Sequence, residues 1–274
     1  WNGTNYILVA GAHSGASPAF RYGSTLAGLS TAGSLGSSSM ADHCQFTPGG
    51  ITIFVGSDVS FPVRYIAANS STVVQASGSS LPLVGVASNG SSAAVAIAGE
   101  SSTSSPGGIV SSTNGTSWTG RTGAATSVTK MMGVHWSPAA SKFLIYGRNG
   151  TSNLAIASSA DGYTSLSTVL NNAAYDTIGD GSSQIPGLAA SSPTVTLIGA
   201  KRLSDGSTGF LRTTDGTTFT FVSLADDTSL PMWGYANVSL RVWWDSANSR
   251  FIAYNPQNQM FFGNYVGMYS SADG

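Results

Sequence analysis

Residues 194–216 read TVTLIGAKRLSDGSTGFLRTTDG and contain the pattern that decides the fold. An apolar run rich in β-branched residues ends at Gly199, and a second run leads into the dipeptide Asp215-Gly216. Short runs of this kind, bounded by turn residues, predict buried strands. The segment therefore predicts two antiparallel strands joined by a loop over 200–208, with a turn after the second strand.

The first of these runs recurs along the whole chain. Its copies are YILVAG at 6–11, ITIFVG at 51–56, AVAIAG at 94–99, FLIYG at 143–147, TVTLIG at 194–199 and FIAYN at 251–255, where Asn255 replaces the glycine. Their last residues are 45, 43, 48, 52 and 56 positions apart. A repeat of roughly 40 to 50 residues is typical of a four-stranded propeller blade. The sequence predicts an all-β, six-bladed β-propeller with four-stranded antiparallel blades.

A second element follows the runs in the same phase. It reads IVSSTNGTSW at 109–118, LAIASSADGYTSL at 154–166, FLRTTDGTTF at 210–219 and VGMYSSADG at 266–274, with weaker copies at 20–26 and 65–73. Asn-Gly or Asp-Gly between β-rich segments is a strong hairpin signal, because both residues tolerate the positive φ of a primed turn. We expect tight structural turns at Asn114-Gly115, Asp161-Gly162, Asp215-Gly216 and Asp273-Gly274.

The inner strand of each blade precedes the apolar run, as in GVHW at 133–136 and RVWW at 241–244. Trp1 aligns with the ends of these two segments, so blade one lacks most of its inner strand and blade six lacks its outer strand. Unpaired strand edges are a liability for a sheet. We expect one propeller domain over 1–274, part of a longer chain, with segments outside this numbering or a partner chain completing both blades.

The charge content excludes several classes of partner. Only 8% of the 274 residues are charged, with 11 Lys and Arg against 12 Asp and Glu, where a soluble domain usually has about a quarter. Such a chain has no basic stripe for binding nucleic-acid phosphates and no polybasic segment for a membrane surface. Its apolar runs are too short to cross a bilayer. We expect no nucleic-acid partner and no membrane insertion.

Half of these charges are expected on one face of the propeller. Loops that join second to third strands, and one blade to the next, emerge on that face. They carry Asp42, Asp58, Glu100, Lys130, Arg148, Asp176, Asp180, Lys201, Arg202, Asp205, Asp226 and Asp227. The enrichment is modest and is what solvated loop charges would give, and a binding face is the alternative.

Blades five and six have the longest insertions on this face, at 171–187, 200–208 and 225–237. Aromatic side chains beside carboxylates suit a sugar, whose apolar ring face stacks while its hydroxyls bond to the carboxylates. Besides Tyr175, we expect ligand-binding residues at Asp176, Asp180, Lys201, Arg202, Asp226, Asp227, Trp233 and Tyr235.

Metal and nucleophile sites are not indicated by the sequence. Asp42, His43 and Cys44 lie together, but no second ligand pair follows at the spacing of a zinc site. We expect a buried thiol beside a polar loop, no metal and no cofactor. His135 is expected to be a packed or channel-lining side chain. Packing between sheets is expected of Trp243, Trp244, Phe251, Tyr254, Phe261, Phe262 and Tyr265.

The turn sequences SSTNGTSW, SSADGYTSL, TTDGTTF and SSADG resemble the Asp-box, or bacterial neuraminidase repeat. In sialidase-like propellers this repeat lies between the third and fourth strands, which the resemblance implies here as well. The copies depart from the pattern because glycine directly follows Asp or Asn and only Trp118 keeps the terminal Trp. Asp-boxes occur in sialidases, other glycosidases, lectins and virion proteins, so the resemblance concerns fold more than function.

Catalysis like that of sialidases would need an arginine triad and a tyrosine nucleophile activated by a glutamate. The chain has one glutamate, Glu100, and its nearest arginine motifs, at Arg21 and Arg64, are expected on third strands. A two-carboxylate glycosidase stays open, because spacing along the chain does not show which aspartates converge. We expect no catalytic residues.

The composition, rich in Ser, Thr, Gly and Ala and poor in charge, resembles that of bacteriophage tail-fibre, spike and other virion appendage proteins. The resemblance implies an extracellular or virion-surface module that binds a host-surface glycan or receptor, or packs against neighbouring virion chains. The alternatives are a secreted carbohydrate-binding lectin and a glycoside hydrolase of sialidase-like fold.

Overall fold

A computed structural model describes residues 6–10, 19–34, 40–46, 50–56, 62–67, 70, 72–78, 81–99, 108–121, 127–150, 153–177, 188–224, 241–254 and 268–274. These residues form strands, turns and bends, with no helix among them. Within this part of the chain there is accordingly no helix long and apolar enough to cross a membrane. The all-β prediction is confirmed.

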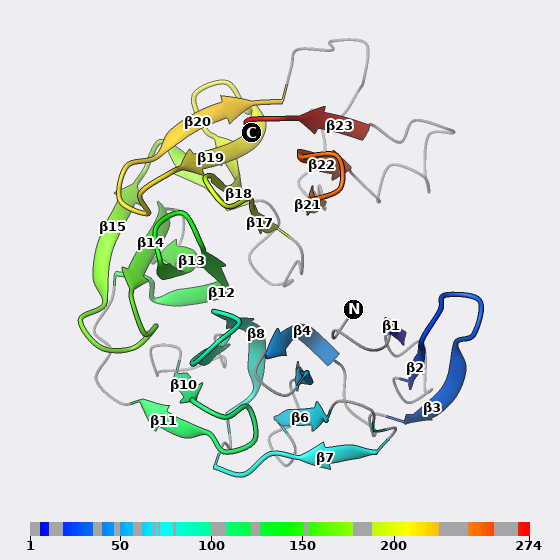
Figure 1. Cartoon of the computed structure of the whole chain (residues 1–274). Coiled ribbons are helices and arrows are strands. Elements are labelled where there is room, and N and C mark those ends of the chain that lie inside the picture. The colour runs from blue at the N-terminus through cyan, green and yellow to red at the C-terminus, as the bar shows by residue number, and fades with distance from the viewer. Residues whose placement is uncertain are drawn as a thin grey trace. The chain divides into compact units, whose positions relative to one another are not determined.

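The described strands form six antiparallel sheets, numbered here in chain order (Figure 1). Sheet one is β1 (Tyr6–Ala10), β2 (Ala19–Gly23) and β3 (Ser30–Ser34). Sheet two is β4 (Met40–Phe46), β5 (Ile51–Gly56), β6 (Val63–Ile66) and β7 (Val73–Gln75). Sheet three is β8 (Leu83–Ser88), β9 (Ala94–Ala98), β10 (Ile109–Ser112) and β11 (Thr119–Arg121).

Sheet four is β12 (Lys130–Ser137), β13 (Lys142–Asn149), β14 (Asn153–Ser159) and β15 (Ser167–Asn172). Sheet five is β16 (Tyr175–Asp176), β17 (Ala189–Ser191), β18 (Thr196–Arg202), β19 (Thr208–Thr213) and β20 (Thr220–Ser223). Sheet six is β21 (Arg241–Asp245), β22 (Arg250–Tyr254) and β23 (Met268–Ser271).

Strand order follows the predicted meander from inner to outer strand. In sheets two to six the repeated apolar run is the second position of the sheet, at β5, β9, β13, β18 and β22. In sheet five two short segments, β16 and β17, share the inner position and pair with opposite ends of β18. In the described part of the chain sheets one and six have three strands each, and the missing positions are the inner one and the outer one.

Burial explains why the second strands read as continuous apolar runs. All five residues of β9, AVAIA, are buried, whereas every residue of the outer strand β15 is exposed or only partly buried. A strand with both faces covered needs apolar residues at every position, so the alternation of a half-exposed strand is lost. The second strands therefore lie inside the packed layers and the outer strands lie at the surface.

The chain divides into two compact units, Trp1–Ala124 and Ala125–Gly274. In the first unit the inner strands β4 and β8 are neighbours, and buried side chains of sheets two and three share one core. In the second unit β17 lies next to both β12 and β21, and sheets four, five and six share another core. Sheets two and three therefore meet along their inner strands, and so do sheets four, five and six.

The turns with the sequence Asx-Gly, called here the Asx-Gly turns, differ from the predicted primed hairpins. The four glycines have positive φ, between 67° and 82°, but the preceding Asn or Asp does not. The connection in sheet five is also longer than a tight turn, because β19 ends at Thr213 and β20 begins at Thr220. The prediction of a two-residue primed turn was wrong, and the side chain of the Asx residue gives the reason.

In sheet five the carboxylate of Asp215 takes the place of a backbone acceptor. Its Oδ1 accepts hydrogen bonds from the amides of Thr217 and Thr218 at 2.8 and 2.7 Å, while the Gly216 amide donates to Thr213 Oγ1 at 2.9 Å. Because the side chain satisfies these two amides, only the glycine needs the left-handed conformation. The turns at Asn114 and Asp161 repeat the same bonds.

Each Asx-Gly turn of the second unit for which the contact is described lies against the preceding sheet. A Cβ atom on Gly216 would be 2.9 Å from Ala140 in the β12–β13 connection of sheet four. A Cβ atom on Gly274 would be 2.8 Å from Leu197 of sheet five. The Asp273 carbonyl also accepts a hydrogen bond from Arg212 Nε at 2.8 Å. These turns therefore join one sheet to the next.

Candidate functional site

Six charged residues gather where strands of sheets four and five end, at the end opposite to the Asx-Gly turns. Lys130 begins β12 and lies opposite Arg148, near the end of β13. Asp176 and Lys201 are paired positions of β16 and β18, as are Tyr175 and Arg202. Asp205 follows in the loop after β18. We call Lys130, Arg148, Asp176, Lys201, Arg202 and Asp205 the charged rim. Their common placement was predicted from the loop connections.

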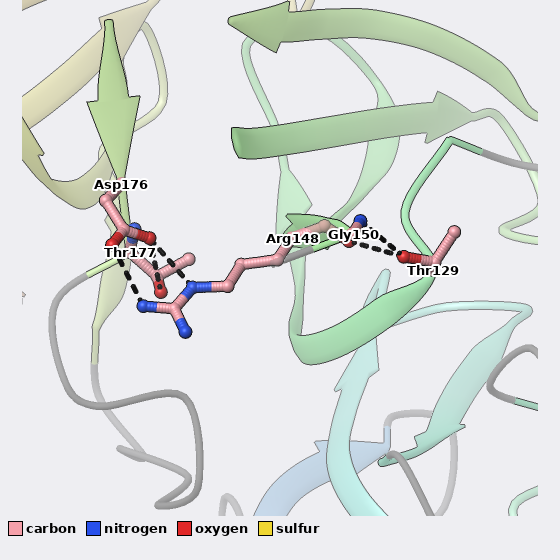
Figure 2. Close-up of polar contacts among 5 residues, drawn as sticks. All are labelled: Thr129, Arg148, Gly150, Asp176 and Thr177. Carbon is pink, nitrogen blue, oxygen red and sulfur yellow. Dashed lines mark hydrogen bonds and ion pairs between the residues drawn. The ribbon is translucent and has the colours of Figure 1, made fainter. Parts of the chain in front are cut away.

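An ion pair between Arg148 and Asp176 joins the two sheets. Arg148 Nε lies 2.8 Å from Asp176 Oδ1 and Arg148 Nη2 lies 3.0 Å from Oδ2, so the contact is bidentate (Figure 2). The side chains are 11% and 21% exposed. The Thr177 amide donates a further bond to Oδ1 at 2.7 Å. Planar, bidentate pairs of this kind fix both distance and orientation.

The backbone of Arg148 is also held in place. Thr129 Oγ1 donates to the Arg148 carbonyl at 3.2 Å and accepts from the Gly150 amide at 2.9 Å (Figure 2). The Thr129 hydroxyl therefore bridges two backbone groups at the end of β13, the Arg148 carbonyl and the Gly150 amide. The Arg148 side chain therefore leaves a strand end whose backbone is held by hydrogen bonds, which helps to fix where its guanidinium meets Asp176.

A second, more exposed ion pair lies next to it in sheet five. Arg202 Nε donates to Asp205 Oδ1 at 3.1 Å, and the guanidinium lies 5.0 Å from the centre of the Phe221 ring. Hydrogen bonds from Arg202 and from the Ser207 amide hold the pKa of Asp205 below its usual range. Tyr175 stacks on Phe221 with ring centres 5.5 Å apart.

The structure brings three of the eight predicted ligand residues together, namely Asp176, Lys201 and Arg202. They lie on strands, whereas the sequence placed them in the insertions 171–187 and 200–208; these parts of the insertions pair as β16 and β18. The other five, Asp180, Asp226, Asp227, Trp233 and Tyr235, lie outside the described residues.

Two residues of this region have a different role from the expected one. Tyr175 was expected on a loop with its ring available to a sugar, but it is partly buried and Phe221 covers one side of it. Arg148 was assigned to the face but not to the ligand set. Its position in the sequence could have indicated this role, because Arg148 directly follows the apolar run FLIYG, at the end of a buried strand.

At the other end of the strands, the aspartates of the Asx-Gly turns are engaged by their own turns. Burial raises the pKa of Asp161, but hydrogen bonds from Thr164, Tyr163 and Ser159 outweigh it and lower the pKa to about 2. The amides of Thr218 and Thr217 hold the pKa of Asp215 below its usual range. These carboxylates are therefore ionised and committed to local structure.

A chain of hydroxyl groups joins the inner strands of sheets four and five. His135 Nε2 lies 2.8 Å from Ser191 Oγ, which lies 2.7 Å from Thr196 Oγ1, and Thr196 donates to Ser137 Oγ at 2.8 Å. Burial lowers the pKa of His135 to about 4. A base of such low pKa is poorly matched to proton transfer at neutral pH. His135 is partly buried and hydrogen-bonded, and the expectation that it is a packed or channel-lining side chain stays a prediction.

Other predicted positions are placed as follows. Cys44 is partly buried on the inner strand β4 and packs against the core of the first unit, where a buried thiol beside a polar loop was expected. No group of three or more metal-binding side chains occurs in the described ranges.

Trp244 packs on the buried Phe251 as expected, with ring centres 4.8 Å apart. Trp243 is 40% exposed, so the prediction that it packs between sheets was wrong. Tyr254 lies on β22, while Phe261, Phe262 and Tyr265 lie outside the described residues.

No protein-family model and no curated protein matches the chain. Solved structures match most of it. The β-propeller domain of the Trilobed protease from Pyrococcus furiosus has a TM-score of 0.58 at 8% identity, over 98% of this chain and 79% of that chain. A mutant of AofleA from Arthrobotrys oligospora has a TM-score of 0.58 at 9% identity, over 99% and 91%. A chain of the nidogen/laminin complex has a TM-score of 0.53 at 10% identity, over 92% and 89%.

These similarities show the fold. The chain is a β-propeller, and the six sheets of its described residues are compatible with the six blades predicted from the repeat.

Proposed function

We propose that the chain is a non-catalytic recognition module, a β-propeller whose charged rim binds a host-surface glycan or receptor. The observation that carries the proposal is the bidentate Arg148–Asp176 pair, with Lys201 and Arg202 on the neighbouring strand positions. Carbohydrate hydroxyls both donate and accept hydrogen bonds. A carboxylate and cationic donors fixed side by side offer partners for both.

The rarity of charge in this chain strengthens the argument. With 8% charged residues, a cluster of four cations and two carboxylates at one rim is a departure from the rest of the sequence. Ion pairs that serve only solubility are usually dispersed over a surface. Here one pair is largely buried and its arginine backbone is supported by Thr129.

The assignment to a virion appendage, such as a bacteriophage tail fibre or spike, is supported by composition and by the Asp-box-like turns. Small polar residues fill most turns and outer strands. A nearly neutral surface of this kind suits packing against neighbouring virion chains without burying unpaired charge. The proposed location is extracellular or at the virion surface.

A glycan array combined with a sugar-release assay tests the function. We expect saturable binding without turnover, and about a tenfold loss of affinity in Lys201→Ala, since a hydrogen bond to a charged donor is worth roughly 1.5 kcal/mol or more. Lys142→Ala is the matched control, because this lysine begins β13 at the end opposite to Arg148. Absence of binding to every glycan would refute the glycan-binding role. Release of sugar, lost on changing an aspartate, would favour the glycosidase instead.

A further inference from the structure

We infer that the ligand of the charged rim is an uncharged saccharide, not an acidic or sulfated one. The inference rests on the proposed function and adds the chemical class of the ligand. It follows from how the two arginines of the charged rim are already used. Arginine is the residue that recognises carboxylate and sulfate groups through its planar fork of donors, so the state of each fork decides whether an anion can bind.

The fork of Arg148 is occupied by Asp176. Nε and Nη2, the side-on pair of donors, bind the two oxygens of one carboxylate at 2.8 and 3.0 Å. Asp176 is held by the Thr177 amide as well as by Arg148. To bind these two nitrogens, a ligand carboxylate would have to displace the Asp176 carboxylate. Asp176 belongs to the same chain and therefore has a high effective concentration at Arg148.

The fork of Arg202 is occupied in the same way. Its Nε and Nη2 atoms contact the two oxygens of Asp205, and Nη2 also contacts Ser207 Oγ at 3.4 Å. The guanidinium lies over the Phe221 ring. Both arginines are therefore charge-compensated by residues of this chain, so a ligand carboxylate or sulfate would find each arginine fork of the charged rim already holding a carboxylate.

The same arrangement favours a neutral hydroxylated ligand. Asp176 Oδ1 accepts bonds from Arg148 Nε, the Thr177 amide and, at 3.4 Å, Thr177 Oγ1, whereas Oδ2 accepts the bond from Arg148 Nη2. Each oxygen of an ionised carboxylate has about two acceptor positions. The side chain is 21% exposed, and in the proposed complex a sugar hydroxyl donates to the second acceptor position of Oδ2. Lys201, exposed and paired with Asp176 across the strands, can donate to the oxygen of the same or a neighbouring hydroxyl.

The experiment compares neutral saccharides with uronate-containing, sialylated and sulfated ones on one array, followed by calorimetry of the best binder at 50 and 500 mM NaCl. We expect neutral saccharides to bind, with less than about a twofold change in Kd across this salt range, because no net charge is neutralised. Preferred binding of anionic saccharides, with a Kd that rises steeply with salt, would overturn the inference and leave the recognition role standing. Absence of binding to both classes would overturn both.

Lys201→Gln gives a second, independent readout and does not touch the partly buried ion pair. The amide of glutamine still donates a hydrogen bond but carries no charge. With a neutral ligand we expect Kd to rise by no more than about threefold, compared with about tenfold in Lys201→Ala. A loss in Lys201→Gln as large as that in Lys201→Ala would show that the ligand needs the charge, and would contradict the inference.

Discussion

The two ends of the strands in sheets four and five hold their carboxylates in different ways. At the Asx-Gly turns, Asp161 and Asp215 are bound by hydrogen bonds from residues two and three positions further along the chain. At the charged rim, Asp176 is bound by Arg148, 28 residues away and in another sheet. The first arrangement is local and repeated, and the second is long-range and occurs at one place in the described residues.

The difference indicates a structural role for the turn aspartates and a functional role for the Arg148–Asp176 pair. A local bond that recurs in sheet after sheet is part of how each blade is built, and it cannot distinguish one blade from another. The long-range pair at the junction of sheets four and five gives that junction a charged chemistry that the local turn bonds do not supply. For this reason we place the recognition site at the charged rim and assign the turn aspartates to stability.

The largest effect is expected from a glycine-to-alanine change in the turns. Gly216 has φ of 67° and its added Cβ would lie 2.9 Å from Ala140, whereas Gly206 at the rim has φ of 75° and open space around it. The left-handed conformation alone costs about 1 kcal/mol, and the collision adds to it. We expect Gly216→Ala to lower the free energy of unfolding by about 2 to 4 kcal/mol and Gly206→Ala by about 1 kcal/mol. Urea denaturation measures both, and equal losses would mean that the turn is not packed on sheet four.

Acid should weaken the junction of sheets four and five through His135. Its pKa falls from 6.5 to about 4 on folding because of burial. Between these values the unfolded chain binds more protons, so this contribution is complete above about pH 6.5 and is lost as the pH falls toward 4. We expect a loss of up to about 3 kcal/mol. His135→Gln keeps a hydrogen-bonding side chain but does not titrate, and an equally steep pH dependence in that variant would contradict the assignment.

Breaking the Arg148–Asp176 pair should cost less than the turn collision but remain measurable. Both side chains are mostly buried, so removing one partner leaves the other charge uncompensated. A double-mutant cycle of Arg148→Gln and Asp176→Asn, followed by urea denaturation, should give a coupling free energy of about 1 to 3 kcal/mol. A coupling near zero would mean that the two sheets are not joined at this point.

The smallest effect is expected at the neighbouring exposed pair. Arg202 and Asp205 have side chains 37% and 44% exposed, and ion pairs in water contribute little to stability. Asp205→Asn should leave the urea midpoint unchanged. Its effect should appear in ligand selectivity instead, because the Arg202 fork becomes available to anions. A clear loss of stability in this variant would show that the pair is structural.

The sequence predicted what depends on local pattern. The apolar runs could be placed because a strand buried on both faces must be apolar throughout, as in β9. The turn positions could be placed because Asn or Asp followed by Gly has a distinct conformational preference. The turn type was predicted wrongly, since the side-chain bonds of Asp215 remove the need for a second residue with positive φ.

The sequence could not predict the partners across sheets. Arg148 and Asp176 come together only because sheets four and five pack side by side. The local sequence around either residue does not indicate which residue it will contact. Tyr175 and Phe221 both belong to sheet five but are far apart in the sequence, and their stacking removes from the ligand site an aromatic ring that the sequence had placed there. Strand pairing also moved Asp176, Lys201 and Arg202 from expected loops onto strands.

The most direct test of the recognition site is an amide NMR titration of the isotopically labelled protein with the best-binding saccharide from the array. The account predicts that shifts concentrate at Asp176, Thr177, Lys201, Arg202 and Gly206, while the amides of Gly115, Gly162 and Gly216 in the Asx-Gly turns stay unchanged. Shifts that concentrate at the Asx-Gly turns, with the charged rim unaffected, would contradict it.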